Sequence, residues 1–284
     1  MTMEHAKKFG MNERKTIASM FSAARGPSAF LGGRLISAAG YLRYLASVSA
    51  AVLWQALRPL NWRRSVRREF MRQCYFTGAR ALPFVVILAL LVGLGMVFEI
   101  LFWLDIVGQE GYVGRLMVLL LVREIAPILV ALVVIGRSGA AILAELGNMR
   151  IAGQVRMLDA LGLDPFIFML LPRVIAVMVC MFCLTVTFLA LALGSGFILA
   201  HVTGIATAGI LDMVNEVLRA VQPDEFVGIA MNMFFSGLVI GVICCTNGLG
   251  IGRDPTEVPR MLPRTFAQCV IALFTISICI SFVL

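Results

Sequence analysis

Five long apolar stretches alternate with short polar ones along this chain of 284 residues. About 20 apolar residues cross the hydrocarbon core of a bilayer as a helix, so each stretch is long enough for one crossing. The third is longer than a single crossing needs, and we expect it to tilt, kink or leave the membrane as a helical stub. The pattern predicts an all-α integral membrane protein with spans at 83–104, 112–136, 166–200, 226–248 and 266–284.

Residues 36–57 form a further apolar stretch, but it carries Arg43 and a dense run of arginine follows it. Apolar side chains recur on one face at helical spacing: Tyr41, Leu45, Val48 and Val52. This pattern favours an amphipathic helix on the membrane surface, and a sixth span is the alternative. We therefore expect a tail over 1–35, an interfacial helix and basic connector over 36–80, and a transmembrane domain over 81–284.

The distribution of charge predicts the orientation in the membrane. Fourteen of the 24 Lys and Arg residues lie in residues 1–80, against three acidic residues, which places the N-terminus in the cytoplasm by the positive-inside rule. The predicted outer loops, 105–111 and 201–225, are mostly acidic, and five spans then place the C-terminus outside. The net charge of +8 is therefore a membrane-surface effect and does not indicate nucleic-acid binding.

Composition excludes several classes of function. Hydrophobic residues make up 60% of the chain and charged residues 14%, whereas soluble domains are about a quarter charged. The sequence has no phosphate-binding loop and no hydrolase, metalloprotease or dinucleotide-binding motif. Cys180 and Cys183 have redox-motif spacing, but they lie in mid-span without a nearby histidine, which favours a packing role. We expect no catalytic residue, no metal site and no cofactor bound by this chain itself.

Charged residues inside or beside the second apolar stretch are the first candidates for function: Arg115, Arg123, Glu124 and Arg137. A charge in mid-membrane costs about 2.5–3.5 kcal/mol, so it usually has a partner or a task. Arg123 and Glu124 are adjacent and point about 100° apart on a helix, so each needs a partner elsewhere. The open alternatives are a structural ion pair between helices and a polar cavity. Pro127 is expected to kink this helix.

A short polar segment from Glu145 to Asp164 separates the second and third spans. Gly147 permits a sharp turn, and Gln154, Met157 and Leu158 fall on one side of a short helix. Such a cytoplasmic helix is a handle for a soluble partner, and a surface or re-entrant helix without a partner is the alternative.

Other candidates lie near the outer end of the first span. Glu99 is expected to pair with Arg115 or to face a cavity, and the alternative is an acid at the outer interface. Leu94, Phe98 and Phe102 form a stripe that lines an apolar cavity or simply packs. Several spans carry closely spaced glycines, which permit close helix packing, and Gly237-x-x-x-Gly241 is a candidate dimer seam.

An ordered series of motifs over 121–175 closely resembles the MlaE/YrbE family of permeases, which work in ABC transporters with MCE proteins. The matching residues are Arg123-Glu124-Ile125-Ala126-Pro127, Gly136-Arg137-Ser138-Gly139-Ala140-Ala141, Ala144-Glu145-Leu146-Gly147-Asn148-Met149-Arg150, Gln154, Asp164-Pro165 and Pro172-Arg173.

The resemblance implies a homodimer in the bacterial inner membrane, with the C-terminus periplasmic. Two ATPase subunits, which bind ATP and Mg, would contact a coupling segment that contains Glu145, Gly147, Met149, Arg150, Gln154, Met157 and Leu158. A periplasmic hexamer of MCE-domain protein would receive or deliver phospholipid, with or without a small cytoplasmic regulatory subunit. The lipid cavity would be lined by Leu94, Phe98, Glu99 and Phe102.

The sequence therefore leaves two classes of function open. The first is a permease of lipids driven by partner ATPases, and the second is a membrane scaffold or channel that needs no ATPase. A membrane enzyme acting on lipids is poorly supported, because the sequence contains no acid–base or nucleophilic constellation.

Overall fold

The computed structural model describes residues 27–58, 64–107, 121, 124–202, 223–252 and 254–283. These residues are almost entirely helical and include no strand, so the all-α prediction is confirmed. The chain divides into two compact units, Met1–Ala51 and Val52–Leu284.

The helix that begins in the first unit is α2 (Pro27–Ala56), and it starts nine residues before the predicted surface helix. Leu45 is buried, whereas Leu42 and Tyr44 on the same helix are exposed. Among the described residues, α2 is not one of the five helical segments long and apolar enough to cross a membrane. Its place on the membrane surface stays a prediction.

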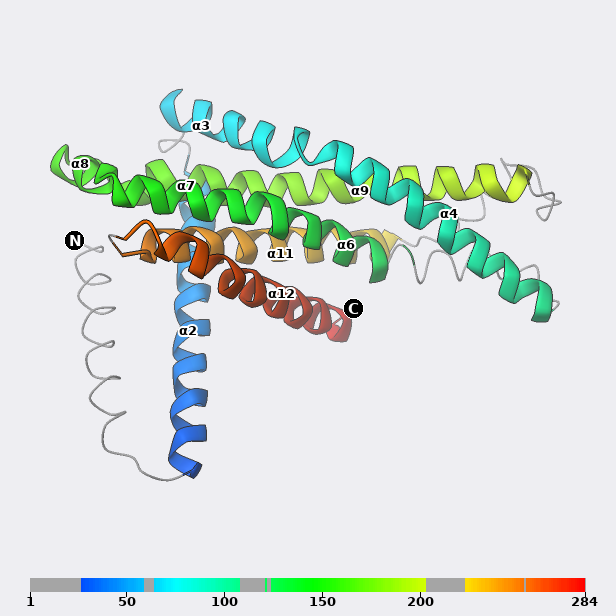
Figure 1. Cartoon of the computed structure of the whole chain (residues 1–284), viewed down its shortest axis with the longest axis horizontal. Helices are drawn as coiled ribbons and strands as arrows, with labels where there is room; N and C mark the ends of the chain where they lie inside the picture. The colour runs from blue at the N-terminus through cyan, green and yellow to red at the C-terminus, as the bar shows by residue number, and fades with distance from the viewer. Residues whose placement is uncertain are drawn as a thin grey trace. The chain divides into compact units, whose positions relative to one another are not determined.

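The second unit contains those five helical segments: Arg64–Met96, Ala126–Ile151, Phe166–Gly196, Val227–Gly250 and Glu257–Phe282. The first combines α3 (Arg64–Cys74), the π-helical turn η2 (Tyr75–Ala79) and the start of α4 (Leu82–Val107). The third combines η6 (Phe166–Leu170) and α9 (Leu171–Val202). The helices lie side by side, and α9 contacts α3, α4, α6 and α11 (Figure 1).

The second span ends later in the chain than predicted. It runs through α6 (Ala126–Val133), the π-helical turn η5 (Val134–Gly139) and α7 (Ala140–Ile151), past the predicted end at residue 136. Alanine, leucine and glutamate continue the helix because they are strong helix formers, although Glu145, Asn148 and Arg150 make its end as polar as a loop. Pro127 lies in the first turn of α6, directly after two π-helical residues at 124–125, and the kink expected there stays a prediction.

The last two spans are α11 (Pro223–Gly250) and α12 (Glu257–Val283). The start of α12 lies nine residues before the predicted 266, and Pro263 is accommodated inside it. The Glu257 carboxylate accepts a hydrogen bond of 2.6 Å from the Gly252 backbone N–H, which ties the α12 start to the preceding turn. Most of both predicted outer loops lies outside the described residues.

Glycines bring the helices together within this chain. A Cβ at Gly93 of α4 would collide with the Ala192 carbonyl oxygen on α9. Cβ atoms at Gly237 and Gly241 would lie 2.8 Å from the Met178 Cα and 3.1 Å from the Val174 Cα, both on α9. The candidate dimer seam at Gly237 and Gly241 is therefore a contact between α11 and α9 of the same chain.

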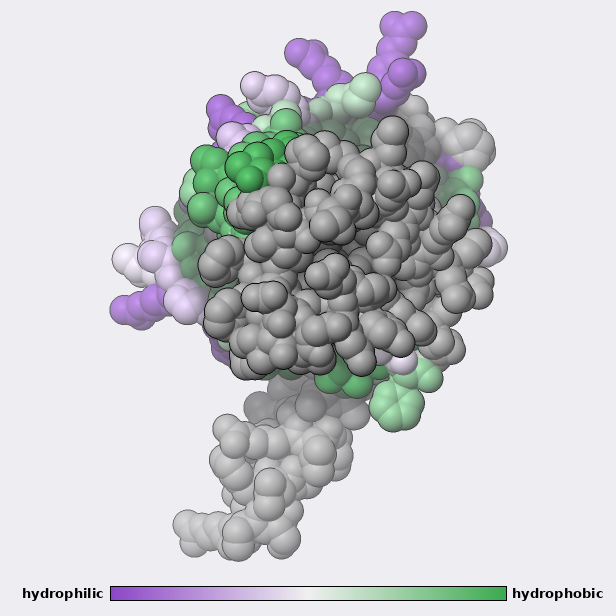
Figure 2. Space-filling view, turned by 90° about the vertical axis from the view of Figure 1, so that its right-hand side faces the viewer, coloured by the Kyte–Doolittle hydropathy of each residue, from purple (hydrophilic) through white to green (hydrophobic). Residues whose placement is uncertain are grey.

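The outward surface of the bundle is apolar, as expected for helices that face lipid. Large side chains are exposed on α4 and α12, including Phe84, Leu91, Ile271 and Phe282. Figure 2 shows hydrophobic side chains gathered in patches on one face, with hydrophilic side chains projecting at its edge. No membrane is part of the structure, and the orientation of the chain stays a prediction.

Candidate functional site

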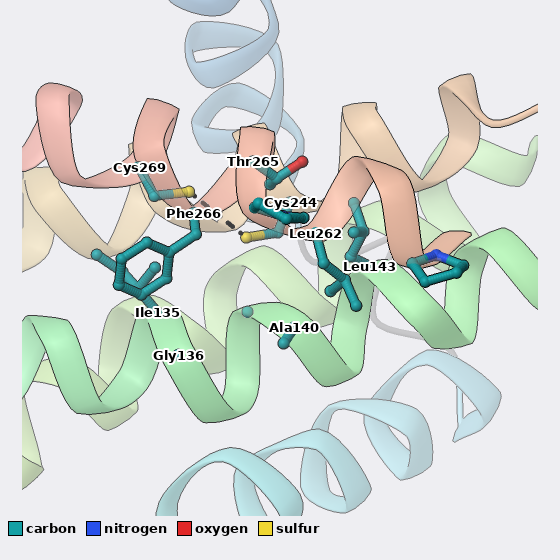
Figure 3. A pocket seen from close by; sticks show the side chains of 12 residues that line it. Ile135, Gly136, Ala140, Leu143, Cys244, Leu262, Thr265, Phe266 and Cys269 are labelled. Atoms are coloured by element: carbon teal, nitrogen blue, oxygen red, sulfur yellow. Dashed lines mark hydrogen bonds between the residues drawn. The ribbon is translucent and has the colours of Figure 1, made fainter. Parts of the chain in front are cut away.

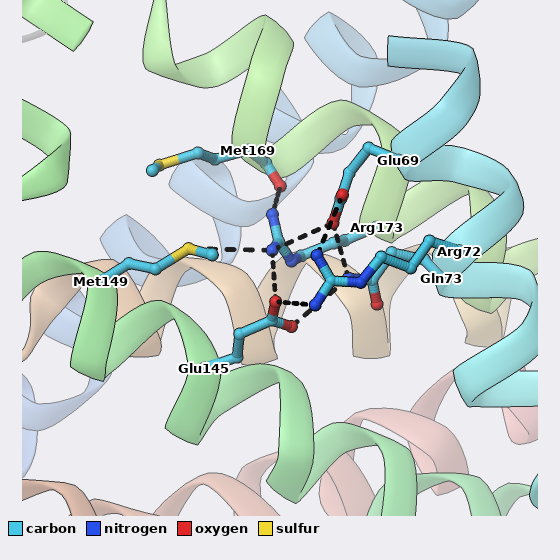
Figure 4. A network of polar contacts seen from close by, with 7 residues as sticks. All are labelled: Glu69, Arg72, Gln73, Glu145, Met149, Met169 and Arg173. Atoms are coloured by element: carbon cyan, nitrogen blue, oxygen red, sulfur yellow. Dashed lines mark hydrogen bonds and ion pairs between the residues drawn. The ribbon is translucent and has the colours of Figure 1, made fainter. Parts of the chain in front are cut away.

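A buried polar cluster joins three helices near the end of the bundle that carries α8 (Gln154–Ala160) (Figures 1 and 4). We call it the arginine–carboxylate cluster; its members are Glu69, Arg72 and Gln73 of α3, Glu145 and Met149 of α7, Met169 of η6, and Arg173 of α9.

Arg173 is the centre of the cluster, and its side chain is only 2% exposed. Its Nη2 lies 3.0 Å from Glu145 Oε1 and 3.3 Å from Glu69 Oε1. Its Nη1 donates a 2.7 Å hydrogen bond to the Met169 carbonyl. A buried guanidinium is tolerated only when carboxylates and hydrogen-bond acceptors replace the water it loses. These contacts serve the two terminal nitrogens and fix α9 to both α3 and α7, whereas the buried Nε of Arg173 has no hydrogen-bond partner among the described residues.

A second layer closes the cluster towards solvent. Arg72 is 54% exposed and lies 3.5 Å from Glu69 Oε2 and 3.7 Å from Glu145 Oε1. The buried Gln73 amide donates to Glu69 Oε1 at 2.9 Å and to Glu145 Oε2 at 3.3 Å. Two arginines thus balance two carboxylates, and the cluster is electrically neutral.

Helical spacing explains how each segment presents its side chains. Glu69 and Gln73, Glu145 and Met149, and Met169 and Arg173 are each four residues apart, and such pairs share one face of a helix. Figure 4 shows the three pairs converging from three segments. The sequence indicates Arg173 only as part of a motif, and no role is predicted for Glu69. A single arginine in a long apolar run is the signal that could have identified Arg173.

Beyond α7, the chain turns through Ala152 and Gly153 into the short helix α8. Gly153 has φ +76° and Gly162 has φ +69°, which is the left-handed region that favours glycine, so one such residue stands on each side of α8. The expected short helix is therefore present between these two glycines. Met157 and Leu161 are 65% and 71% exposed, which is unusual for large apolar side chains at a polar end.

The structure separates the predicted coupling residues into two groups. Glu145 and Met149 belong to the cluster, where the Met149 sulfur lies 3.8 Å from Arg173 Nη2. The exposed members are Arg150, Gln154 and Met157, and Leu158 is half-buried.

Gly147 does not form the expected sharp turn. It is buried inside α7, where a Cβ would lie 2.7 Å from Ile251 Cδ1 and 3.2 Å from Val258 Cγ2. The residue is small because the segment that joins α11 to α12 packs against it.

The candidates at the other end of the bundle are less fully described. Leu94 on α4 is 39% exposed, and Glu99 is exposed and has an interaction within the structure. The side chains of Phe98 and Phe102 lie outside the described set, as do Arg115 and Arg123 as whole residues. The pairing of Glu99 with Arg115 therefore stays a prediction.

The remaining intramembrane candidates lie apart from the cluster. Glu124 is exposed. Arg137, in η5, donates from Nη1 to the Arg80 carbonyl and so links the second span to the end of η2.

A cavity of about 380 Å³ lies between the second span, α11 and α12 (Figure 3). Its lining is mostly apolar and includes Ile135, Leu143, Leu262 and Phe266. The thiols of Cys244 and Cys269 meet at its wall with their sulfurs 3.7 Å apart. All seven cysteines are unpaired by disulfides, and the described residues include no cluster of side chains suited to a metal ion.

Five helices long and apolar enough to span a membrane define a polytopic membrane protein. Residues 70–283 match the family model described as Permease MlaE, so the chain belongs to the MlaE permease family. The family resemblance seen in the sequence is thereby confirmed. The chain is a transport permease and not an enzyme in its own right.

Curated relatives agree with this assignment. A probable ABC transporter permease protein of Rickettsia typhi is 29% identical over 191 residues, which cover 67% of this chain and 73% of that protein. Protein TRIGALACTOSYLDIACYLGLYCEROL 1, chloroplastic, of Arabidopsis thaliana is 28% identical over 206 residues, 70% of this chain but 57% of its own length. The intermembrane phospholipid transport system permease protein MlaE of Haemophilus influenzae is 28% identical over 134 residues, 46% of this chain and 51% of that protein.

Proposed function

We propose that this chain is the membrane subunit of an ABC transporter that moves phospholipid or a related amphiphile between the inner membrane and a periplasmic MCE-domain protein. Membership of the MlaE permease family supports the transport role. The relative from Haemophilus influenzae, named as a phospholipid transport permease, supports the class of cargo. ATP and Mg would bind to two partner ATPase subunits and not to this chain.

The observation that carries the proposal is an exposed apolar patch on α8 and the residue that ends it. Met157 of α8 and Leu161, its C-cap residue, are spaced four residues apart, so they form one small patch at the polar end of the bundle. A short helix with an exposed apolar anchor is suited to a groove on a soluble protein. We assign this patch as the contact with the ATPase.

The arginine–carboxylate cluster supplies a route from that contact into the membrane. A displacement of α8 moves the end of α7, which carries Glu145. Glu145 is bonded to Arg173 of α9 and to Gln73 of α3, so the displacement reaches both helices through directional contacts. Nucleotide on the ATPase and lipid in the cavity would bias the same two-state equilibrium.

Two copies of the chain would complete the transporter. Five spans are few for a full transport path, and a symmetric dimer supplies twice that number around a shared cavity. In this arrangement Leu94, Phe98, Glu99 and Phe102 would line the lipid cavity, and a periplasmic MCE hexamer would cover its outer mouth. A small cytoplasmic regulatory subunit is compatible with the same assembly.

Copurification of candidate ATPases with matched variants tests the proposal. Leu161→Glu places a charge in the α8 patch, and Leu57→Glu makes the same change at an 80% exposed leucine elsewhere. We expect the first to reduce the recovered ATPase at least about tenfold, because a desolvated charge replaces an apolar anchor. The second should leave recovery unchanged. Changes at Gly147 or Met149 would test the contact less directly, because these residues are buried or half-buried and their contacts also stabilise the fold.

An ATPase that remains bound to the Leu161→Glu variant would contradict the assignment of α8. Failure to recover any coexpressed ATPase with the unaltered chain would favour the alternative, a scaffold or channel that works without ATP.

A further inference from the structure

A basic groove lies along α3, on the outer side of the arginine–carboxylate cluster. Its volume is about 750 Å³, and it is lined by Arg64, Ser65, Arg68, Glu69 and Arg72. The three arginines are spaced four residues apart, so they follow one face of the helix and point into the same groove. The groove is therefore an open one along a single helix, and four of its five lining side chains are exposed.

The charge of the groove is unbalanced. Three guanidinium groups face one carboxylate, that of Glu69, whose two oxygens are already held by Arg173, Gln73 and Arg72. Within the part of the chain that the structure describes, Arg64 and Arg68 form no ion pair. Guanidinium groups bind phosphate oxygens through paired, charge-assisted hydrogen bonds. The groove thus has the chemistry of an anion site that recognises phosphate.

The position of the groove indicates where that phosphate comes from. Helix α3 leads through η2 into α4, and together they include the first membrane-spanning segment. Just beyond the groove lie two exposed aromatic side chains, Tyr75 and Phe76, which form a small aromatic belt. The Phe76 ring lies between two guanidinium groups, with its centre 5.6 Å from Arg72 Cζ and 4.6 Å from Arg80 Cζ. Arginine beside exposed aromatic side chains is typical of the headgroup level of a bilayer.

We propose that this groove binds the headgroup phosphate of an anionic membrane phospholipid, with Arg64, Arg68 and Arg72 as its ligands and the acyl chains against the belt below. A zwitterionic headgroup suits the groove less well, because its ammonium would approach three arginines. The site is distinct from the cavity for transported lipid, and it requires neither the ATPase nor the MCE partner.

Arg72 gives this site a connection to the interior. The same guanidinium lines the groove and lies 3.7 Å from Glu145, so a bound phosphate competes with the weaker of the two arginine contacts of Glu145. Arg173, at 3.0 Å, remains paired with that carboxylate. The annular lipid is therefore in electrostatic contact with the cluster that joins α3, α7 and α9.

Binding to the purified full chain in detergent tests the site, with phosphatidylglycerol and phosphatidylcholine as probes and native mass spectrometry as the readout. The matched variants are Arg68→Gln and Arg67→Gln, which remove the same charge from neighbouring exposed positions. Arg67 does not line the groove. Loss of long-range attraction is common to both variants and weakens binding about fivefold. Loss of a charge-assisted hydrogen bond should weaken phosphatidylglycerol binding about tenfold further in Arg68→Gln alone.

Three results would overturn the proposal. Equal weakening by the two variants would mean general surface attraction without a site. Equal retention of phosphatidylcholine and phosphatidylglycerol by the unaltered chain would remove the anion specificity. Binding of free glycerol phosphate as tight as that of the lipid would assign the groove to a soluble anion. Unchanged melting temperatures of both variants without added lipid confirm that neither loss reflects misfolding.

Discussion

Replacement of Arg173 by methionine tests whether the arginine–carboxylate cluster holds the bundle together. Methionine fills a similar length of apolar space but removes the charge and the hydrogen bond to the Met169 carbonyl. The Glu69 and Glu145 oxygens that contact Arg173 Nη2 at 3.3 and 3.0 Å are then no more than about 6 Å apart. The two carboxylates then repel each other, and Arg72 is the arginine that still contacts both of them.

The magnitude follows from this geometry. Two like charges about 6 Å apart repel by about 3 kcal/mol at an effective dielectric constant of about 20. Removal of one partner from a buried ion pair costs about 3–5 kcal/mol in proteins generally. We therefore expect Arg173→Met to lower the free energy of unfolding by that amount, equivalent to a melting temperature lower by about 10 °C for a chain of this size.

Thermal unfolding of the detergent-purified protein, followed by the loss of the folded peak in size-exclusion chromatography, measures the effect. Arg72→Gln is the matched control, because Arg72 contacts the same two carboxylates but is 54% exposed. An exposed pair contributes about 0.2–1 kcal/mol, so this variant should melt within about 3 °C of the unaltered protein. Addition of Glu145→Gln to Arg173→Met should restore part of the stability, since it removes the repulsion.

The reasoning would be refuted if Arg173→Met and Arg72→Gln melted at the same temperature. It would also fail if Glu145→Gln lowered stability equally with and without Arg173, because a double-mutant cycle would then give no coupling between the two residues.

Three further substitutions test other parts of the fold. Gly93→Ala should lower the free energy of unfolding by about 1–3 kcal/mol, and with it the melting temperature, because its Cβ would collide with the α9 backbone. Gly95→Ala, with open space around it, should be neutral or stabilising. Equal melting temperatures of the two variants would contradict the close approach of α4 to α9. Asn247→Ala removes two hydrogen bonds from α11 to α12 and should cost about 1 kcal/mol in the same assay, with no change counting against a bridging role. Gly153→Ala forces a Cβ into a left-handed conformation at a cost of about 1 kcal/mol and should speed limited proteolysis around α8; a digestion rate equal to that of the unaltered protein would show that the turn before α8 tolerates a side chain.

The spans were predictable because each has a run of apolar residues long enough to cross the membrane. The ends of the helices were harder to predict. Glu145 to Ile151 continue α7, although their composition resembles that of a loop. Propensity favoured a helix there and hydropathy favoured a loop, and the packing of Gly147 against Ile251 and Val258 is invisible in the sequence. The presence of α8 was predictable, because a polar segment of fixed length separates two spans.

The cluster was not predictable as a unit. Its three helices supply side chains from positions far apart in the chain, with a sequence separation of 72 between Gln73 and Glu145. One sequence shows which charges are costly in a membrane, but it does not show which of them meet. The sequence therefore indicates Arg173 only as part of a motif, whereas the adjacent charges of Arg123 and Glu124 are the more conspicuous candidates in the neighbouring span.

The π-helical turn η5 absorbs one extra residue between the two halves of the second span. A turn with hydrogen bonds from each residue to the fifth one along holds one residue more than an α-helical turn, and one residue of an α-helix corresponds to about 100° of rotation. Loss of a single residue within Val134–Gly139 would therefore restore plain α-helix and leave α7, with α8 behind it, facing the same way relative to α6. The same deletion in an α-helical part of the span would rotate everything behind it by about 100°. The turn is thus a place where the span can gain or lose one residue without re-aiming α8.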